Sequence, residues 1–245
     1  TLTPFTRDEL WAAVFLGHRQ NAASVPALSN DGTDLRDYLC GETIEANGHY
    51  VMHGACPAAL ISLFTPPQPT ITADALRLLS VNGSLNFRHT IISEFVYPDQ
   101  RQGIKHLDRR IGQVGRSANS LTGKYKLSPE ARVALEDLAH LRHDLAGGRA
   151  ALAQVRLSVV VYGHPARTRA ELAASLKELD RNCEQVISEI RKISGADADR
   201  EEPHALRVLY QKALVGEMNV SKTGREITET ARALAPLIPT ESEWA

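Results

Sequence analysis

The sequence has few aromatic residues, few cysteines and no long apolar run. Aromatic residues make up 5% of its 245 residues, so a core in this chain has to be built mainly from aliphatic side chains. The three cysteines, Cys40, Cys56 and Cys183, are too few and too widely spaced for a disulfide framework, which favours a reducing compartment. No run of about 18 apolar residues occurs, so we predict no membrane-spanning segment.

A clear charge excess is also missing. The chain has 28 basic and 29 acidic side chains, with a formal net charge of −1, whereas proteins that mainly grip nucleic acid usually have a basic excess. A hydrophobic fraction of 43% is typical of a globular protein and excludes a disordered chain. The opening residues do not have the pattern of a secretory signal, and the chain begins at Thr1 rather than Met, so we expect a piece of a longer protein.

Hydrophobic periodicity and helix-capping and turn residues predict the order of the elements. A capping-box pattern predicts a helix over 6–18. Runs rich in apolar and β-branched residues predict strands over 49–54, 59–64, 87–96 and 155–162. Apolar residues at helical spacing predict helices over 72–81, 98–118, 129–146, 168–193 and 225–237. The segment 204–214 fits either a helix or a strand, with a helix slightly favoured. The predicted fold class is α+β: a split β-α-β mixed sheet with a long helical hairpin, about 98–149, inserted between its two halves, and additional flanking helices.

One segment has nearly the spacing of a phosphate-binding loop, G-x-x-x-x-G-K-[ST]. The matching residues are Gly216, Lys222 and Thr223, but Ser221 stands where the second glycine is needed for backbone N–H groups to curl around phosphate. No apolar strand ending in Asp follows to hold a metal ion. The favoured interpretation is a polar loop with a chance spacing.

Four potential zinc ligands lie within 17 residues: Cys40, His49, His53 and Cys56. Their spacing matches none of the common structural zinc sites. Two strand residues four apart are about 13 Å from each other, which is too far for His49 and His53 to share one ion unless the strand turns. Surface histidines and buried thiols are therefore favoured over a metal site.

Basic residues gather in the first helix of the predicted hairpin and in the loop after it. Residues 98–126 contain seven basic and two acidic side chains; the basic ones are Arg101, Lys105, Arg109, Arg110, Arg116, Lys124 and Lys126. Such an arm could touch a membrane surface, nucleic acid or an acidic partner. A solvated helix face is the ordinary alternative. Tyr125 is the only aromatic residue there, so the pattern does not indicate stacking on single-stranded bases.

The order of these elements resembles the amino-terminal region of the CagE/TrbE/VirB family, the large ATPases that energise type IV secretion and conjugation. The resemblance covers residues 48–245: ALISLF leading into Thr65-Pro66, a helix, FRHTIISEFVYPD, the basic hairpin, and VRLSVVVYG with its long helix. Ala213-Leu214-Val215-Gly216 stands where the family has a Leu-Pro-Gly-like turn, with Val in place of the usual Pro. Ala233-Leu234-Ala235-Pro236-Leu237 resembles the segment before the ATPase core.

The resemblance implies a non-catalytic interaction domain over 48–245, preceded by a helical and irregular segment over 1–47. ATP and Mg²⁺ would be bound only by a carboxy-terminal ATPase core that this chain lacks. The implied role is to dock the ATPase to inner-membrane subunits of a secretion channel, at the cytoplasmic face of a bacterial inner membrane, and to support oligomerisation. The alternatives are a small α+β nucleotide-binding protein or enzyme using the 216–223 loop, and a nucleic-acid-binding arm over 98–126.

Overall fold

The computed structural model describes residues 6–19, 24–27, 39, 42–67, 79, 85–119, 129–193, 195–214 and 223–237. The chain divides into two compact units. The sheet unit contains Thr1–Glu94, Arg156–Glu226 and Pro236–Ala245. The hairpin unit contains Phe95–Val155 and Ile227–Ala235.

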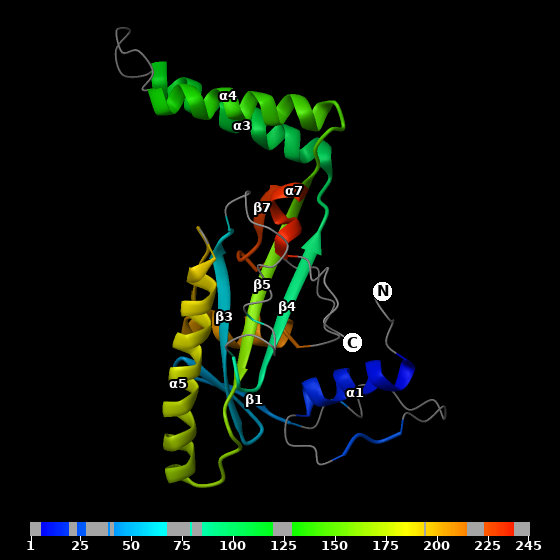
Figure 1. Ribbon diagram of the computed structural model, residues 1–245, viewed down its shortest axis with the longest axis vertical. Coiled ribbons are helices and arrows are strands. Elements are labelled where there is room, and N and C mark those ends of the chain that lie inside the picture. The colour runs from blue at the N-terminus through cyan, green and yellow to red at the C-terminus, as the bar shows by residue number, and fades with distance from the viewer. Residues whose placement is uncertain are drawn as a thin grey trace. The chain divides into compact units, whose positions relative to one another are not determined.

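Figure 1 shows the elements. The strands are β1 (Ile44–Asn47), β2 (Tyr50–His53), β3 (Cys56–Thr65), β4 (His89–Val96), β5 (Leu152–Tyr162), β6 (Asp197–Arg200) and β7 (Ile227–Thr230). The helices are α1 (Arg7–His18), α3 (Gln100–Asn119), α4 (Pro129–Ala146), α5 (Arg169–Lys192), α6 (Pro203–Lys212), α7 (Ala231–Leu234) and the 3₁₀ turn η2 (Ala235–Leu237).

The strand order is β1-β2-β3-β5-β4, with β6 paired to β3 and β7 paired to β5. Strand β3 pairs with both β5 and β6, and both pairs are antiparallel. Strands β5 and β6 are therefore parallel to each other with β3 between them, and α5 connects them. This is one half of a split β-α-β arrangement.

The other half consists of β3 and β4 with β5 between them. The Tyr162 N–H donates to the carbonyl of Arg88, and Arg156 pairs with Glu94, so residue numbers rise along β4 as they fall along β5. In Figure 1 the arrows of β3 and β4 accordingly point the same way and that of β5 the opposite way. The predicted helix over 72–81 lies outside the described residues, except for Leu79, which is buried.

The predicted α+β class is thus confirmed, and the hairpin is inserted between β4 and β5 as expected. The expectation of a mixed sheet needs correction, since all five strand pairs with an assigned register are antiparallel. The reason is topological. In a split β-α-β arrangement the two parallel strands are not neighbours, because an antiparallel strand lies between them.

Aliphatic side chains fill the core, as the shortage of aromatic residues predicts. On one face of the sheet, Leu206, Leu209 and Tyr210 of α6 pack on Leu60 and Val160 of the central strands. Residues alternate between faces along a strand, and the intervening residues of β3 and β5 are also buried. Helix α5 packs on β3 and β6. Both faces of the central strands are therefore covered.

Two further sequence predictions need correction. No strand is predicted between residues 193 and 204, but Asp197–Arg200 forms β6, because the carboxy-terminal half of β3 offers a free edge beyond its pairing with β2. The segment 225–237 was expected to be helical throughout. Its first half is instead β7, which pairs with residues 152–155 of β5, and a single helical turn, α7, follows.

The amino-terminal part also differs from the predicted boundary at residue 48. Strand β1 pairs with β2 and so belongs to the sheet. Helix α1 begins with the predicted capping box, in which Thr6 and Glu9 satisfy each other's backbone N–H groups. Its carbonyl at His18 accepts a hydrogen bond from His53 of β2, so the helix is fastened to the sheet unit.

Candidate docking site

The hairpin formed by α3 and α4 is the main candidate for docking. The two helices lie side by side in Figure 1 and share an apolar seam. Its members are Ile104 and Leu107 on α3, and Leu138, Leu141 and Leu145 on α4. Arg142 of α4 also pairs with Asp108 of α3, both half-exposed. The seam uses the apolar faces of both helices and leaves their polar faces to solvent.

Four of the predicted basic residues are exposed on α3: Arg101, Lys105, Arg109 and Arg110. The structure therefore brings them together on one element. Arg116 belongs to the same helix, but its side chain lies outside the described ones, as do Lys124 and Lys126. Helix α4 begins at the predicted Pro129, and Gly148, with a φ of 68°, allows the chain to turn toward β5 at its end.

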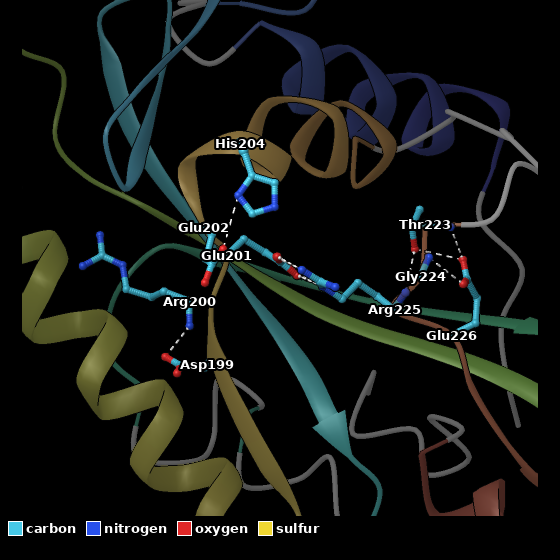
Figure 2. Close-up of polar contacts among 9 residues, drawn as sticks. All are labelled: Asp199, Arg200, Glu201, Glu202, His204, Thr223, Gly224, Arg225 and Glu226. Atoms are coloured by element: carbon cyan, nitrogen blue, oxygen red, sulfur yellow. Dashed lines mark hydrogen bonds and ion pairs between the residues drawn. The ribbon is translucent and has the colours of Figure 1, made fainter.

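A second polar cluster lies in the sheet unit, where the chain enters α6 (Figure 2). Glu201 has a fully buried side chain and accepts two hydrogen bonds from Arg225, at 2.8 Å from Nε and 2.9 Å from Nη2. The hydrogen bonds with Glu201 raise the pKa of Arg225 above its ordinary value. The guanidinium also lies 5.2 Å from the ring centre of Phe64. This pair fastens the segment before β7 to the sheet.

Thr223 is the only described residue of the phosphate-loop candidate; Gly216, Ser221 and Lys222 lie outside the described part. The N–H and hydroxyl of Thr223 both donate to Glu226, at 2.6 and 2.8 Å, and the Gly224 N–H donates to the same carboxylate (Figure 2). Burial acts to raise the pKa of Glu226, but these hydrogen bonds outweigh it and hold the pKa below its ordinary value. An internal carboxylate therefore occupies these donors.

The chain after Thr223 also departs from a phosphate-binding loop. Such a loop leads directly into a helix, whose amino-terminal N–H groups face the phosphate. Here Thr223 is followed by an irregular segment and then by strand β7. The local geometry is that of a turn closed by Glu226.

The four zinc-ligand candidates do not form a cluster in the described part of the chain, where no group of three or more His, Cys, Asp or Glu residues could hold a metal ion. Cys40 lies outside the described residues, and His49 is exposed at the turn between β1 and β2. Cys56 is buried, and burial raises the pKa of its thiol.

His53 is a core residue, 1% exposed, with both ring nitrogens engaged. Nδ1 lies 2.9 Å from the hydroxyl of Tyr210 and Nε2 lies 2.8 Å from the carbonyl oxygen of His18. Burial lowers the pKa of His53 and outweighs the opposing effect of Glu42, whose carboxylate is 3.9 Å from Nε2. The neutral ring thus donates to His18 and accepts from Tyr210, which ties α1 and α6 to β2.

Sequence reasoning missed two arginine–carboxylate pairs in each of which one partner is buried. One is Glu201 with Arg225. The other is Arg156 with Glu94, where the guanidinium, 7% exposed, lies 2.6 Å from the carboxylate and also donates to the carbonyl of Lys212. Partners so far apart along the chain leave no local spacing signal. Glu201 in particular lies in an acidic stretch that resembles a solvated loop.

Comparisons with known proteins add no family assignment to this geometry. Neither the protein-family models nor the curated proteins with which the sequence was compared match this chain. Among the described helices, none is long and apolar enough to cross a membrane.

Proposed function

We propose that this chain is a non-catalytic domain of a type IV secretion or conjugative DNA-transfer ATPase, which docks the ATPase to inner-membrane channel subunits and supports its oligomerisation. The observation that carries the proposal is the long helical hairpin inserted between the two halves of the split β-α-β sheet. This is the element order through which the sequence resembles the CagE/TrbE/VirB family. One fold can carry many functions, so the chemistry of the exposed surfaces is the second line of support.

The hairpin supplies part of that support. Four basic side chains of α3 are exposed, and the apolar faces of α3 and α4 pack against each other. An arm of this kind suits reversible, electrostatically guided contact with another surface. In the proposed assembly the chain would lie at the cytoplasmic face of the inner membrane as a peripheral component.

The turn around Thr223 supports the non-catalytic part. The carboxylate of Glu226 occupies the N–H groups of Thr223 and Gly224, and it would repel a phosphate there. ATP and Mg²⁺ would be bound by the carboxy-terminal ATPase domain of the full-length protein.

The reading frame downstream of Ala245 tests the assignment directly. We expect it to continue into a glycine-rich phosphate-binding loop with the Lys-Ser/Thr ending, followed by an apolar strand that ends in Asp. A frame that stops shortly after Ala245, or that encodes a domain without these features, would overturn the proposal.

A thermal-shift assay with Mg-ATP tests the non-catalytic part. We expect no saturable shift of the melting temperature of the 245-residue chain. A saturable shift that is lost in Lys222→Ala, but kept in the matched Lys177→Ala variant at an exposed position of α5, would instead establish the nucleotide-binding alternative.

A further inference from the structure

Strand β4 is a terminal strand, and among the described strands it pairs with β5 alone (Figure 1). The Tyr162 N–H donates to the carbonyl of Arg88, so Arg88 and every second residue after it turn their N–H and C=O groups toward β5. The backbone groups of His89, Ile91 and Ser93 therefore point away from the sheet. Within the described part of the chain, no hydrogen bond satisfies these outward groups.

The other two edge strands of the sheet unit, β1 and β6, are protected. The Glu201 N–H donates to β3, so Ala198 and Arg200 present their backbone groups at the outer edge of β6. There the Arg200 N–H donates to the carboxylate of Asp199 at 2.8 Å, and the carbonyl of Ala198 accepts from Arg191 at 3.4 Å. Strand β1 is only four residues long. Strand β4 has eight residues and contains neither lysine nor proline, so it lacks the common protections of an edge.

The residues of β4 are complementary to a second β4 that runs in the opposite direction. With Ile91 opposite Ile91 of the second copy, the outward groups of His89 meet those of Ser93, and each N–H faces a C=O. Thr90 then lies beside Ile92 on the face where Ile92 packs toward α6, and the two Ile91 side chains meet on the other face. All these side chains are half-buried in one copy, so the pairing removes further apolar surface from water on both faces.

The charges at the two ends of this segment select the same register. Arg88 is exposed, lies 4.9 Å from the ring centre of Tyr162, and forms no ion pair with a described residue. Glu94 is 37% exposed and pairs with Arg156 through one carboxylate oxygen, which leaves the other available. Both Arg88 and Glu94 are three residues from Ile91, so each Arg88 lies opposite Glu94 of the second copy. A shift by two residues would place Arg88 opposite an uncharged residue instead.

We propose that two copies of this chain form an isologous dimer in which β4 pairs antiparallel with β4 and the sheet continues from one copy into the other. A second copy fits the edge because its backbone groups, its half-buried apolar side chains and its opposite charges match in one register. The inference rests on the oligomerisation that is part of the proposed function, and adds the surface and its symmetry. Both copies use the same edge, so the association stops at a dimer.

A proline in the outer edge tests the proposal by sedimentation velocity of the 245-residue chain over a concentration series. We expect wild type to show a monomer–dimer equilibrium. The N–H of Ile91 points away from β5, so Ile91→Pro keeps the ladder with β5 and removes the two central hydrogen bonds of the dimer. Its apparent Kd should be roughly tenfold or more above that of wild type, since it loses two hydrogen bonds and the close approach of the strands.

The matched control is Ala46→Pro on β1. The Gly54 N–H donates to the carbonyl of Thr43, so the N–H of Ala46, three residues further along β1, also points outward. This variant therefore blocks the opposite edge of the sheet with the same chemical change, and it should dimerise like wild type. Far-UV circular dichroism checks that both proline variants are folded.

Charge variants test the register. Arg88→Glu places two carboxylates together at both ends of the interface, and its apparent Kd should rise by roughly tenfold or more. Arg88→Lys keeps the charge and should stay within about threefold of wild type. Arg169→Glu, at an exposed position of α5, makes the same change in net charge as Arg88→Glu and should dimerise like wild type.

Amide hydrogen exchange of wild type reads the edge directly and needs no variant. The N–H groups of Ile91 and Ser93 should exchange rapidly in dilute solution and become protected as the protein concentration rises. The N–H of Ile92, which faces β5, should be protected at every concentration.

Several results would overturn the proposal. These are a wild type that stays monomeric over the whole series, a dimer that Ile91→Pro or Arg88→Glu leaves unchanged, a dimer lost equally in Ala46→Pro, or no protection of Ile91 and Ser93 on association. A monomeric wild type in which an alternating Val/Thr peptide protects these two amides would assign the edge to an extended segment of a different protein. The reading frame after Ala245 is independent of all these outcomes, so failure here is distinguishable from failure of the proposed function.

Discussion

Replacing Arg225 should destabilise the sheet unit far more than replacing an exposed arginine. The side chain of Glu201 is fully buried. Among the described side chains, Arg225 donates two hydrogen bonds to its carboxylate, at 2.8 and 2.9 Å. In Arg225→Met the carboxylate would keep its burial and lose both of these donors. The perturbation therefore isolates the cost of an unpaired buried charge.

The expected loss in the free energy of unfolding depends on how buried Arg225 and Glu201 each are. Breaking a buried ion pair by removing one partner typically costs about 3–5 kcal/mol. Arg225 is 24% exposed, so water can reach the site once the guanidinium is gone, and we expect about 3 kcal/mol. Glu201→Met should cost less, about 1–2 kcal/mol, because the partly exposed guanidinium can hydrate. The double Met variant removes both charges and should lie within about 1 kcal/mol of wild type.

Urea unfolding followed by tryptophan fluorescence measures these differences. Trp11 is buried in the sheet unit, and Trp244→Phe in every variant leaves Trp11 as the only tryptophan. The control is Arg149→Met, which removes an exposed pair with Asp144 and should cost at most about 0.5 kcal/mol.

Unfolding of Arg225→Met at the same urea concentration as the control would refute the expected cost of the unpaired carboxylate. A double variant as unstable as Arg225→Met would also refute it, because the loss would then come from packing, including the contact with Phe64, rather than from the unpaired charge. Non-additivity of roughly 2 kcal/mol in the double-mutant cycle is the expected result.

Three other outcomes are expected. Burial lowers the pKa of His53 in the folded chain, so the unfolded state takes up the proton first as the pH falls. The free energy of unfolding should therefore decrease as the pH drops below about 6.5. The urea midpoint of His53→Gln should vary less with pH than that of wild type, and an equally steep dependence would count against a buried, neutral His53. Burial raises the pKa of Cys183 to about 12, so in a Cys40→Ser background a thiol reagent at about pH 8 should react only after unfolding; rapid reaction of the folded chain would contradict the burial. In Gly163→Ala the new Cβ would lie 2.5 Å from Oγ of Ser175, which should lower the unfolding free energy by about 1–3 kcal/mol, and a urea midpoint equal to that of wild type would show that the site has room.

Local patterns determined most of the helices and the larger strands. The capping box at Thr6 predicted the start of α1, and Pro129 predicted the start of α4. The apolar stripe over 168–193 predicted α5, whose ends differ from the prediction by one residue. These features depend on residues within a few positions of each other, so the sequence shows them directly. The order of elements, with the hairpin inserted, followed from the same information.

The site residues were only partly accessible from sequence. The cluster of basic residues on α3 was visible, because residues on one helix have a fixed spacing. The role of His53 was not, since it depends on Tyr210 and on the carbonyl of His18, both distant in sequence. The sequence favoured a surface histidine over a metal ligand at this position, whereas the fold buries the ring and uses it as a link between three elements.

Tertiary structure alone decided the short strands β6 and β7 and the ion pairs that contain a buried partner. Asp197–Arg200 looks like an acidic loop, but β3 presents a free edge to it and makes it a strand. Glu201 follows directly and becomes buried, so it needs a cation, which Arg225 supplies from 24 residues away. Pairing partners and burial are properties of the assembled sheet. The sequence therefore determined most of the helices and the long strands, and the assembled fold decided the short strands β6 and β7 and which polar residues leave the solvent.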